Sequence, residues 1–223
     1  MNIYNLLNIK RLSNIDLPSA KFIETTLNEI ITPELNKIGL ENNSYKYLWT
    51  KNYNSNEIKP IIRFSYRGLN GNLMIGNNFK FIPILNENGS FRKNSSTLHL
   101  FENLEFFDTK NKISLWNDKF FKKSIEKIIK TDLKKIENHL NSYNSIEKNI
   151  EIAQRQTNNN SFQYDIRFPN PKYILAFLYA RVGEKEKGIK ILQEFLKENK
   201  IKNTDIIEVL SKIKSTTHNK ELR

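Results

Sequence analysis

The first pattern along the chain is helical. Between residues 19 and 38, apolar residues recur every three or four positions, which is the spacing of one α-helical face. These residues are Ile23, Leu27, Ile30, Ile31, Leu35 and Ile38. Pro18 and Ser19 favour a helix start, and Gly39 favours its end. Pro33 lies inside the pattern, where it lacks an amide hydrogen and its ring clashes with the preceding turn, so we expect a kink or a break.

Residues 44 to about 107 follow a period of two and are rich in β-branched and aromatic residues, which predicts strands. Tyr45, Tyr47 and Trp49 alternate in the first strand. In the next strand two sets alternate, so we expect one buried face and one solvent face. The apolar set is Ile62, Phe64 and Tyr66, and the polar set is Arg63, Ser65 and Arg67.

Asn70-Gly71 predicts a hairpin turn, because both residues tolerate positive φ. The return strand is expected over 73–75 and 79–85 with an interruption near Gly76, and a last strand over 96–101 after a turn at Asn88-Gly89. The pattern therefore predicts a four- or five-stranded antiparallel meander packed on the N-terminal helix.

Helical spacing returns after residue 112. A helix is expected over about 115–140 with one apolar face: Phe121, Ile125, Ile128, Ile129, Ile136 and Leu140. Its opposite face carries Lys119, Lys123, Lys127, Lys130 and Lys134. A shorter helix is expected over 145–155, and the asparagine-rich stretch 156–171, which holds two prolines, predicts a linker or surface loop.

Residues 171–213 are helical again and resemble one tetratricopeptide unit, with a turn at 182–187. The small, aromatic and apolar positions that carry this resemblance are Ala176, Tyr179, Gly183, Gly188, Leu192 and Phe195. A single such unit cannot bury its own apolar faces. We therefore expect it to stack on the preceding helices and on 204–213.

These patterns predict an α+β fold in which the sheet and N-terminal helix are followed by a C-terminal helical bundle. We expect an α+β core domain over 1–155 and a helical hairpin extension over 156–223, packed on that core. The length of 223 residues leaves little room for a second full domain.

Composition points to binding rather than catalysis. The chain has no cysteine, three scattered histidines and no glycine-rich loop, so it lacks most residues used for nucleophilic, metal and phosphate chemistry. We expect no enzyme activity, no cofactor and no metal site. The formal charge of +12 is carried mostly by lysine, whereas arginine is the residue that reads phosphates and base edges.

No apolar stretch approaches the ~20 residues that cross a bilayer, and residues 1–18 offer no uninterrupted apolar region for a signal peptide. We expect a cytoplasmic protein without a membrane partner.

Two acidic groups are candidates for chemistry. His99 with Glu102 and Glu105 could form a carboxylate–imidazole pocket, although the spacing matches no established metal motif. The alternative is a partly exposed strand histidine beside acids that face water. The triplet Glu57-Ile58-Lys59 has the form found in some magnesium-dependent nucleases, but no aspartate precedes it at a suitable distance.

The main candidate binding residues are basic and aromatic. Arg63 and Arg67 lie next to the strand that bears Tyr45, Tyr47 and Trp49, and together they could clamp an anionic partner or stack on single-stranded nucleic acid. The alternative buries the aromatics under helices. Lys123, Lys127 and Lys130 could follow a phosphate backbone or an acidic protein, or form a solvated face.

One family resemblance covers about residues 19–197. A helix ending in Leu35-x-x-x-Gly39-Leu40, an aromatic strand through Tyr47 and Trp49, a meander with Arg63, a long helix and a closing hairpin over 175–196 resemble the bacterial domain of unknown function number 4304. The resemblance implies an α+β fold and supplies no catalytic residues.

Three hypotheses follow. The first is a protein-binding module. Small proteins of this kind are often similar to immunity proteins, which neutralise a bacterial toxin or effector, and this similarity suggests the partner. The second is a nucleic-acid-binding protein that uses Arg63, Arg67 and the lysine face. The third is an unrecognised metal-dependent hydrolase or nuclease centred on His99, Glu102 and Glu105.

Overall fold

The computed structural model describes residues 16–42, 46–85, 91–92, 96–103, 112–158, 170–201 and 204–213. Its first half holds α1 (Ala20–Thr26), the π-helical turn η3 (Leu27–Ile31), α2 (Thr32–Lys37), β1 (Glu41–Asn42), β2 (Leu48–Thr50), β3 (Ile58–Arg67), β4 (Asn70–Phe79), β5 (Ile84–Leu85), β6 (Phe91–Arg92) and β7 (Leu100–Asn103). The second half holds β8 (Ile113–Ser114), α3 (Asp118–Ser142), α4 (Ile146–Asn158), α6 (Pro171–Arg181), α7 (Lys185–Glu198) and α8 (Asp205–Ser211).

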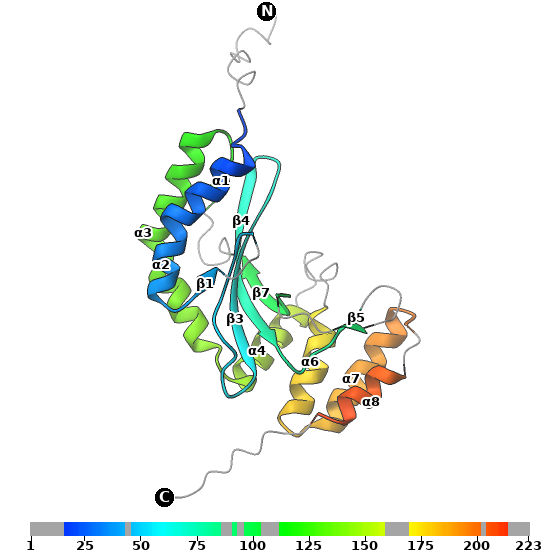
Figure 1. The fold of residues 1–223 in the computed structure, drawn as a ribbon. Coiled ribbons are helices and arrows are strands. Elements are labelled where there is room, and N and C mark those ends of the chain that lie inside the picture. Colours follow the sequence, from blue (N-terminus) through cyan, green and yellow to red (C-terminus); the bar gives the residue numbers. More distant parts are fainter. Residues whose placement is uncertain are drawn as a thin grey trace, which may run out of the picture. The chain divides into compact units, whose positions relative to one another are not determined.

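The predicted α+β class is confirmed: an N-terminal helix precedes an antiparallel sheet, and helices follow it (Figure 1). The main sheet has the order β1-β2-β3-β4-β7, and β8 pairs with β4. Strands β1 and β8 are only two residues long. Strands β5 and β6 form a separate antiparallel pair.

The chain divides into two compact units, each assembled from several stretches. The first unit contains Met1–Trp49, Ile62–Met74 and Asn103–Ile136, and the second contains Thr50–Ile61, Ile75–Glu102 and Glu137–Arg223. Strands β3 and β4 contribute residues to both units. The division into domains at residue 155 stays a prediction.

The N-terminal helix divides as Pro33 predicts. The amide of Thr32 donates to the carbonyl of Leu27, five residues back, which widens one turn into the π-helical segment η3. Pro33 then stands in the first turn of α2, where its missing amide hydrogen costs no helical hydrogen bond. Ser19 caps the start of α1 by accepting a hydrogen bond from the Phe22 amide.

The hairpin turn lies two residues earlier than predicted. Gly68 and Leu69 form the turn, and only Gly68 has a positive φ, at 57°, which is the pattern of a type II′ turn. Asn70 and Gly71 already belong to β4. Gly71 serves packing instead: a Cβ there would lie 2.8 Å from the ring of Phe64.

The predicted interruption at Gly76 is also wrong, because β4 runs through it to Phe79. A Cβ on Gly76 would lie 1.9 Å from the carbonyl oxygen of Leu100. Glycine here allows the close approach of β7 rather than a break in the strand. The predicted turn at Asn88-Gly89 falls outside the described residues.

Helices in the second unit stack around α6. Nearly every residue of α6 is buried, because α4 packs on one side of it and α7 on another, and α8 contacts both α6 and α7. Gly188 of α7 lies against α6, and a Cβ there would be 2.5 Å from the carbonyl oxygen of Ala176. The predicted helical hairpin therefore has the partners it needs on both flanks.

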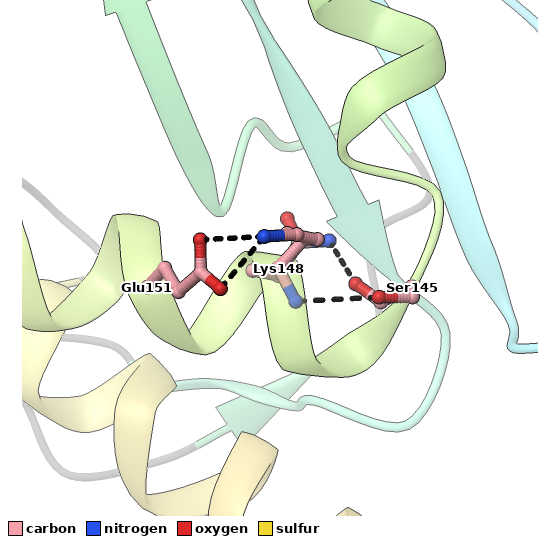
Figure 2. Close-up of polar contacts among 4 residues, drawn as sticks. Ser145, Lys148 and Glu151 are labelled. Carbon is pink, nitrogen blue, oxygen red and sulfur yellow. Dashed lines mark hydrogen bonds and ion pairs between the residues drawn. The ribbon is translucent and has the colours of Figure 1, made fainter.

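The start of α4 shows how local polar contacts fix a helix end (Figure 2). The Ser145 hydroxyl accepts a hydrogen bond from the Lys148 amide at 3.3 Å. One turn later, the Lys148 ammonium contacts both carboxylate oxygens of Glu151, at 2.9 and 3.1 Å. Helix α4 continues to Asn158, three residues beyond the predicted end. Most of the predicted linker at 156–171 lies outside the described residues.

Candidate binding surface

Two of the predicted aromatic residues, Tyr47 and Trp49, contact the N-terminal helical segment. Trp49 is buried, and its indole N–H donates to the Thr32 hydroxyl at 3.0 Å. Tyr47 has a left-handed φ of 61°, and its hydroxyl donates to the carbonyl of Ala20 at 3.3 Å. Tyr45 is outside the described residues. Trp49 therefore has no ring face open to a partner in this conformation.

Arg63 and Arg67 lie on the opposite face of β3 from these aromatics. Phe64 packs on Phe121 of α3, with ring centroids 5.9 Å apart, so α3 covers the face of β3 that carries Phe64. Alternation places the odd-numbered arginines on the other side. Arg67 is exposed, whereas Arg63 is half-buried and this desolvation lowers its pKa. The structure thus separates the predicted arginine and aromatic sets.

Lys123, Lys127 and Lys130 are exposed on α3, as the helical pattern predicts. An exposed ring, Phe120, precedes them on the same helical stripe, three residues before Lys123. The sequence reasoning named these lysines but missed Phe120.

Four large apolar side chains in the described residues are strongly exposed, and all four belong to the first unit. We call them the hairpin-end patch: Leu17 at 52% exposure, Tyr66 at 45%, Trp116 at 42% and Phe120 at 53%. Single exposed apolar residues are common on protein surfaces. Several that lie together are typical of an interaction site.

The fold brings the members of the hairpin-end patch to one end of the first unit. Helices α1 and α3 both begin beside the β3–β4 hairpin turn (Figure 1). Leu17 lies three residues before α1, and the Leu115 amide next to Trp116 donates to the carbonyl of Leu69 in the turn. Tyr66 contacts Tyr47, at 6.4 Å between ring centroids, and thereby lies near the start of α1.

A sequence signal for part of this patch did exist. Phe120 and Phe121 are adjacent in one helix, so their side chains point about 100° apart and only one of them can face the core. Phe121 belongs to the predicted apolar face, which leaves Phe120 outside it. Trp116 and Leu17 gave no such signal, because they precede helices and have no periodic context.

The lysines beside the patch lack ion-pair partners in the part of the chain that the structure describes. No described residue forms an ion pair with Lys119, Lys122, Lys123 or Lys130, in contrast to Lys148 with Glu151 (Figure 2). Arg67 likewise forms none with a described residue. Their charges are therefore available to an incoming anionic group.

His99 is a core residue rather than a partly exposed one. Its side chain is 3% exposed, its ring stacks on Phe79 at 5.8 Å, and Nδ1 accepts a hydrogen bond from the Phe79 amide at 2.9 Å. Burial lowers its pKa to about 3, so the ring is neutral at pH 7. This placement leaves the imidazole without access to a substrate.

Glu102 is equally buried and is held by its neighbours. Its carboxylate accepts hydrogen bonds from Arg155 at 2.6 Å and from Gln156 at 3.0 Å. Burial lowers the pKa of His139 to about 4, although the charge of Glu102 opposes the shift. Glu105 lies outside the described residues. The two described members of the predicted pocket are thus a buried neutral histidine and a buried carboxylate that pairs with the partly exposed Arg155.

Glu57 and Lys59 are also engaged. The Glu57 carboxylate pairs with Arg181 at 2.8 Å, and the Lys59 ammonium lies over the ring of Tyr53, 4.8 Å from its centroid. Burial lowers the pKa of Lys59. The side chains of Glu57 and Lys59 thus contact different neighbours. The described residues contain no group of three histidines or acids that could hold a metal ion.

Two further findings bear on function. Across the described residues, no helix combines the length and apolar character needed to span a bilayer. Comparison of the chain with protein-family models, with curated proteins and with solved structures finds no match. The resemblance to the domain of unknown function therefore stays a prediction.

Proposed function

We propose that this chain is a non-enzymatic protein-binding module and that the hairpin-end patch is its contact surface. The observation that carries the proposal is the exposure of two aromatic rings, Trp116 and Phe120, four residues apart at one end of the first unit. Aromatic side chains exposed on a rigid element are the residues that most often supply binding energy in protein interfaces. The class of partner that we propose is a bacterial toxin or effector domain.

The placement of the candidate chemical groups supports binding over catalysis. His99 and Glu102 are packed and hydrogen-bonded inside the second unit, and Glu57 is neutralised by Arg181. The exposed side chains are instead the rings of Trp116 and Phe120, which are typical of interface contacts, beside Lys123, which forms no ion pair with a described residue.

The test compares two double variants of the patch. Trp116→Ser with Phe120→Ser removes both rings, whereas Trp116→Tyr with Phe120→Tyr keeps aromatic area at the same positions. Immobilised wild-type protein captures partners from an extract of the source cells, mass spectrometry identifies them, and each one is purified and titrated by calorimetry.

We expect at least one purified partner whose Kd rises about tenfold or more with the serine pair and by less than about threefold with the tyrosine pair. The proposal fails if every purified partner binds the serine pair as tightly as wild type, or if no captured protein binds once purified.

A further inference from the structure

The exposed side of α3 carries one continuous row that begins with a ring and continues with ammonium groups. We call it the α3 stripe: Phe120, Lys123, Lys127, Lys130 and Lys134. The spacing is three, four, three and four residues, so these side chains share one face of the helix. At about 1.5 Å per residue, the stripe extends for about 21 Å.

The first unit is strongly basic along this segment. Residues 112–136 hold eight lysines and three acids, Asp118, Glu126 and Asp132. Asp132 is fully buried, and its carboxylate accepts hydrogen bonds from Thr131 at 2.7 Å and Lys135 at 3.1 Å. It therefore offers no countercharge at the exposed stripe.

We propose, on the basis of the function proposed above, that the α3 stripe binds an acidic segment of a protein partner, with an apolar residue of that segment seated at the hairpin-end patch. The lysines of the stripe place positive charge over about three helical turns. An acidic helix with carboxylates every three or four residues presents the complementary spacing. The apolar end of the segment meets Phe120 and Trp116.

The distribution of rings favours an acidic protein over nucleic acid. Single-stranded nucleic acid is held by rings that stack on successive bases along a basic groove. Here Phe120 stands at one end of the stripe, and the four positions that follow it are all lysine. An aliphatic residue, Leu17, shares the patch, and the arginines of β3 face the opposite side of the sheet.

The probe is a synthetic helical peptide of about 14 residues, long enough to match the stripe. It carries leucines at one end and glutamates at every third or fourth position. A second peptide replaces each glutamate by glutamine, and a third probe is a thymidine oligonucleotide of similar length. Amide-resolved NMR titrations to about 1 mM probe detect binding as weak as a millimolar Kd.

The lysine variant is Lys123→Gln with Lys130→Gln. Its matched control is Lys190→Gln with Lys197→Gln, which removes two exposed lysines at the same seven-residue spacing from α7. We expect the glutamate peptide to shift amides of α3 and to bind at least fivefold more weakly to the Lys123/Lys130 variant, with no change in the control. Raising the salt concentration should weaken the binding.

Three outcomes overturn the inference. They are equal binding of the glutamine peptide, tighter binding of the oligonucleotide that depends on Lys123 and Lys130, and no amide shift on α3 at the highest peptide concentration. Equal binding of the glutamine peptide, if lost on Trp116→Ser with Phe120→Ser, leaves the protein-binding proposal standing. Conversely, binding that needs the lysines but not the rings contradicts the proposed patch and the seating of an apolar residue on it, and leaves the contact with the α3 stripe standing.

Discussion

Two histidines inside the second unit remain uncharged because burial disfavours an added proton. The folded-state pKa is about 3 for His99 and about 4 for His139, whereas an unfolded chain titrates near 6.5. Below pH 6.5 the unfolded chain therefore binds protons that the folded protein does not. The stability that depends on these neutral rings is complete above pH 6.5 and falls as the pH drops toward 4 and then 3.

For His99 alone, we expect the free energy of unfolding to decrease by about 1.4 kcal/mol per pH unit between pH 6 and pH 4. His99→Asn keeps an acceptor for the Phe79 amide but does not titrate. Urea titrations of both proteins across this range measure the difference in slope. Parallel pH profiles for the variant and wild type would show that His99 does not cause the acid sensitivity.

The buried carboxylate of Glu102 depends on Arg155, whose guanidinium lies 2.6 Å away and is partly exposed. Arg155→Met keeps most of the side-chain volume but removes the cationic donor, while the neutral Gln156 amide still donates to the Glu102 carboxylate. We expect the variant to lose about 1–3 kcal/mol, less than for a fully buried pair because solvent reaches the arginine. Chemical denaturation at pH 7 checks this, and Arg155→Met with Glu102→Gln should recover part of the loss.

Among the elements, three glycines differ in what a methyl group would meet. A Cβ on Gly76 would lie 1.9 Å from a backbone oxygen of β7, one on Gly188 would lie 2.5 Å from a backbone oxygen of α6, and one on Gly68 would meet open space at a φ of 57°. We expect the loss of stability on substitution by alanine to follow that order.

Gly68→Ala should cost about 1 kcal/mol, because only backbone strain opposes it. Gly188→Ala should cost about 2 kcal/mol or more, and Gly76→Ala should separate β4 from β7 and cost most. Urea midpoints of the three variants at one pH test the ranking. Equal losses for Gly68 and Gly76 would contradict it.

Element types could be predicted from the sequence where the information is local. The 3.6-residue period of α3, the break at Pro33 and the stacking needs of α6 and α7 are all readable along the chain. The hairpin turn was misplaced because Gly71 is needed for packing against the ring of Phe64 and not for a turn. Gly76 was taken for a break in the strand, whereas it allows the close approach of β7. The first contact crosses the hairpin and the second joins strands far apart in sequence, so neither follows from a local pattern.

The candidate surface was predicted only in part, for the same reason. Lys123 and Lys130 lie where a helical period places them, whereas the exposure of Trp116 depends on the hairpin turn beside it. Alternation along β3 already implied that Arg63 and Phe64 face opposite sides. Which of the two sides the helices cover depends on tertiary packing.

At the scale of the whole molecule, the net charge of +12 makes the folded state repel itself. Salt screens this repulsion, so we expect the melting temperature to rise by a few degrees between low and moderate ionic strength. Lys123→Gln with Lys130→Gln should raise the low-salt melting temperature and reduce the salt effect, as scanning calorimetry can measure. A melting temperature that falls with added sodium chloride would contradict this.

Since β3 and β4 each supply residues to both compact units, no single cut in the polypeptide can release either unit whole. Shortening the gene from one end would deprive the remaining half of part of its own sheet. Versions intended to isolate the patch would therefore need the three stretches of the first unit joined by new linkers, and partner searches are best done with the uncut protein.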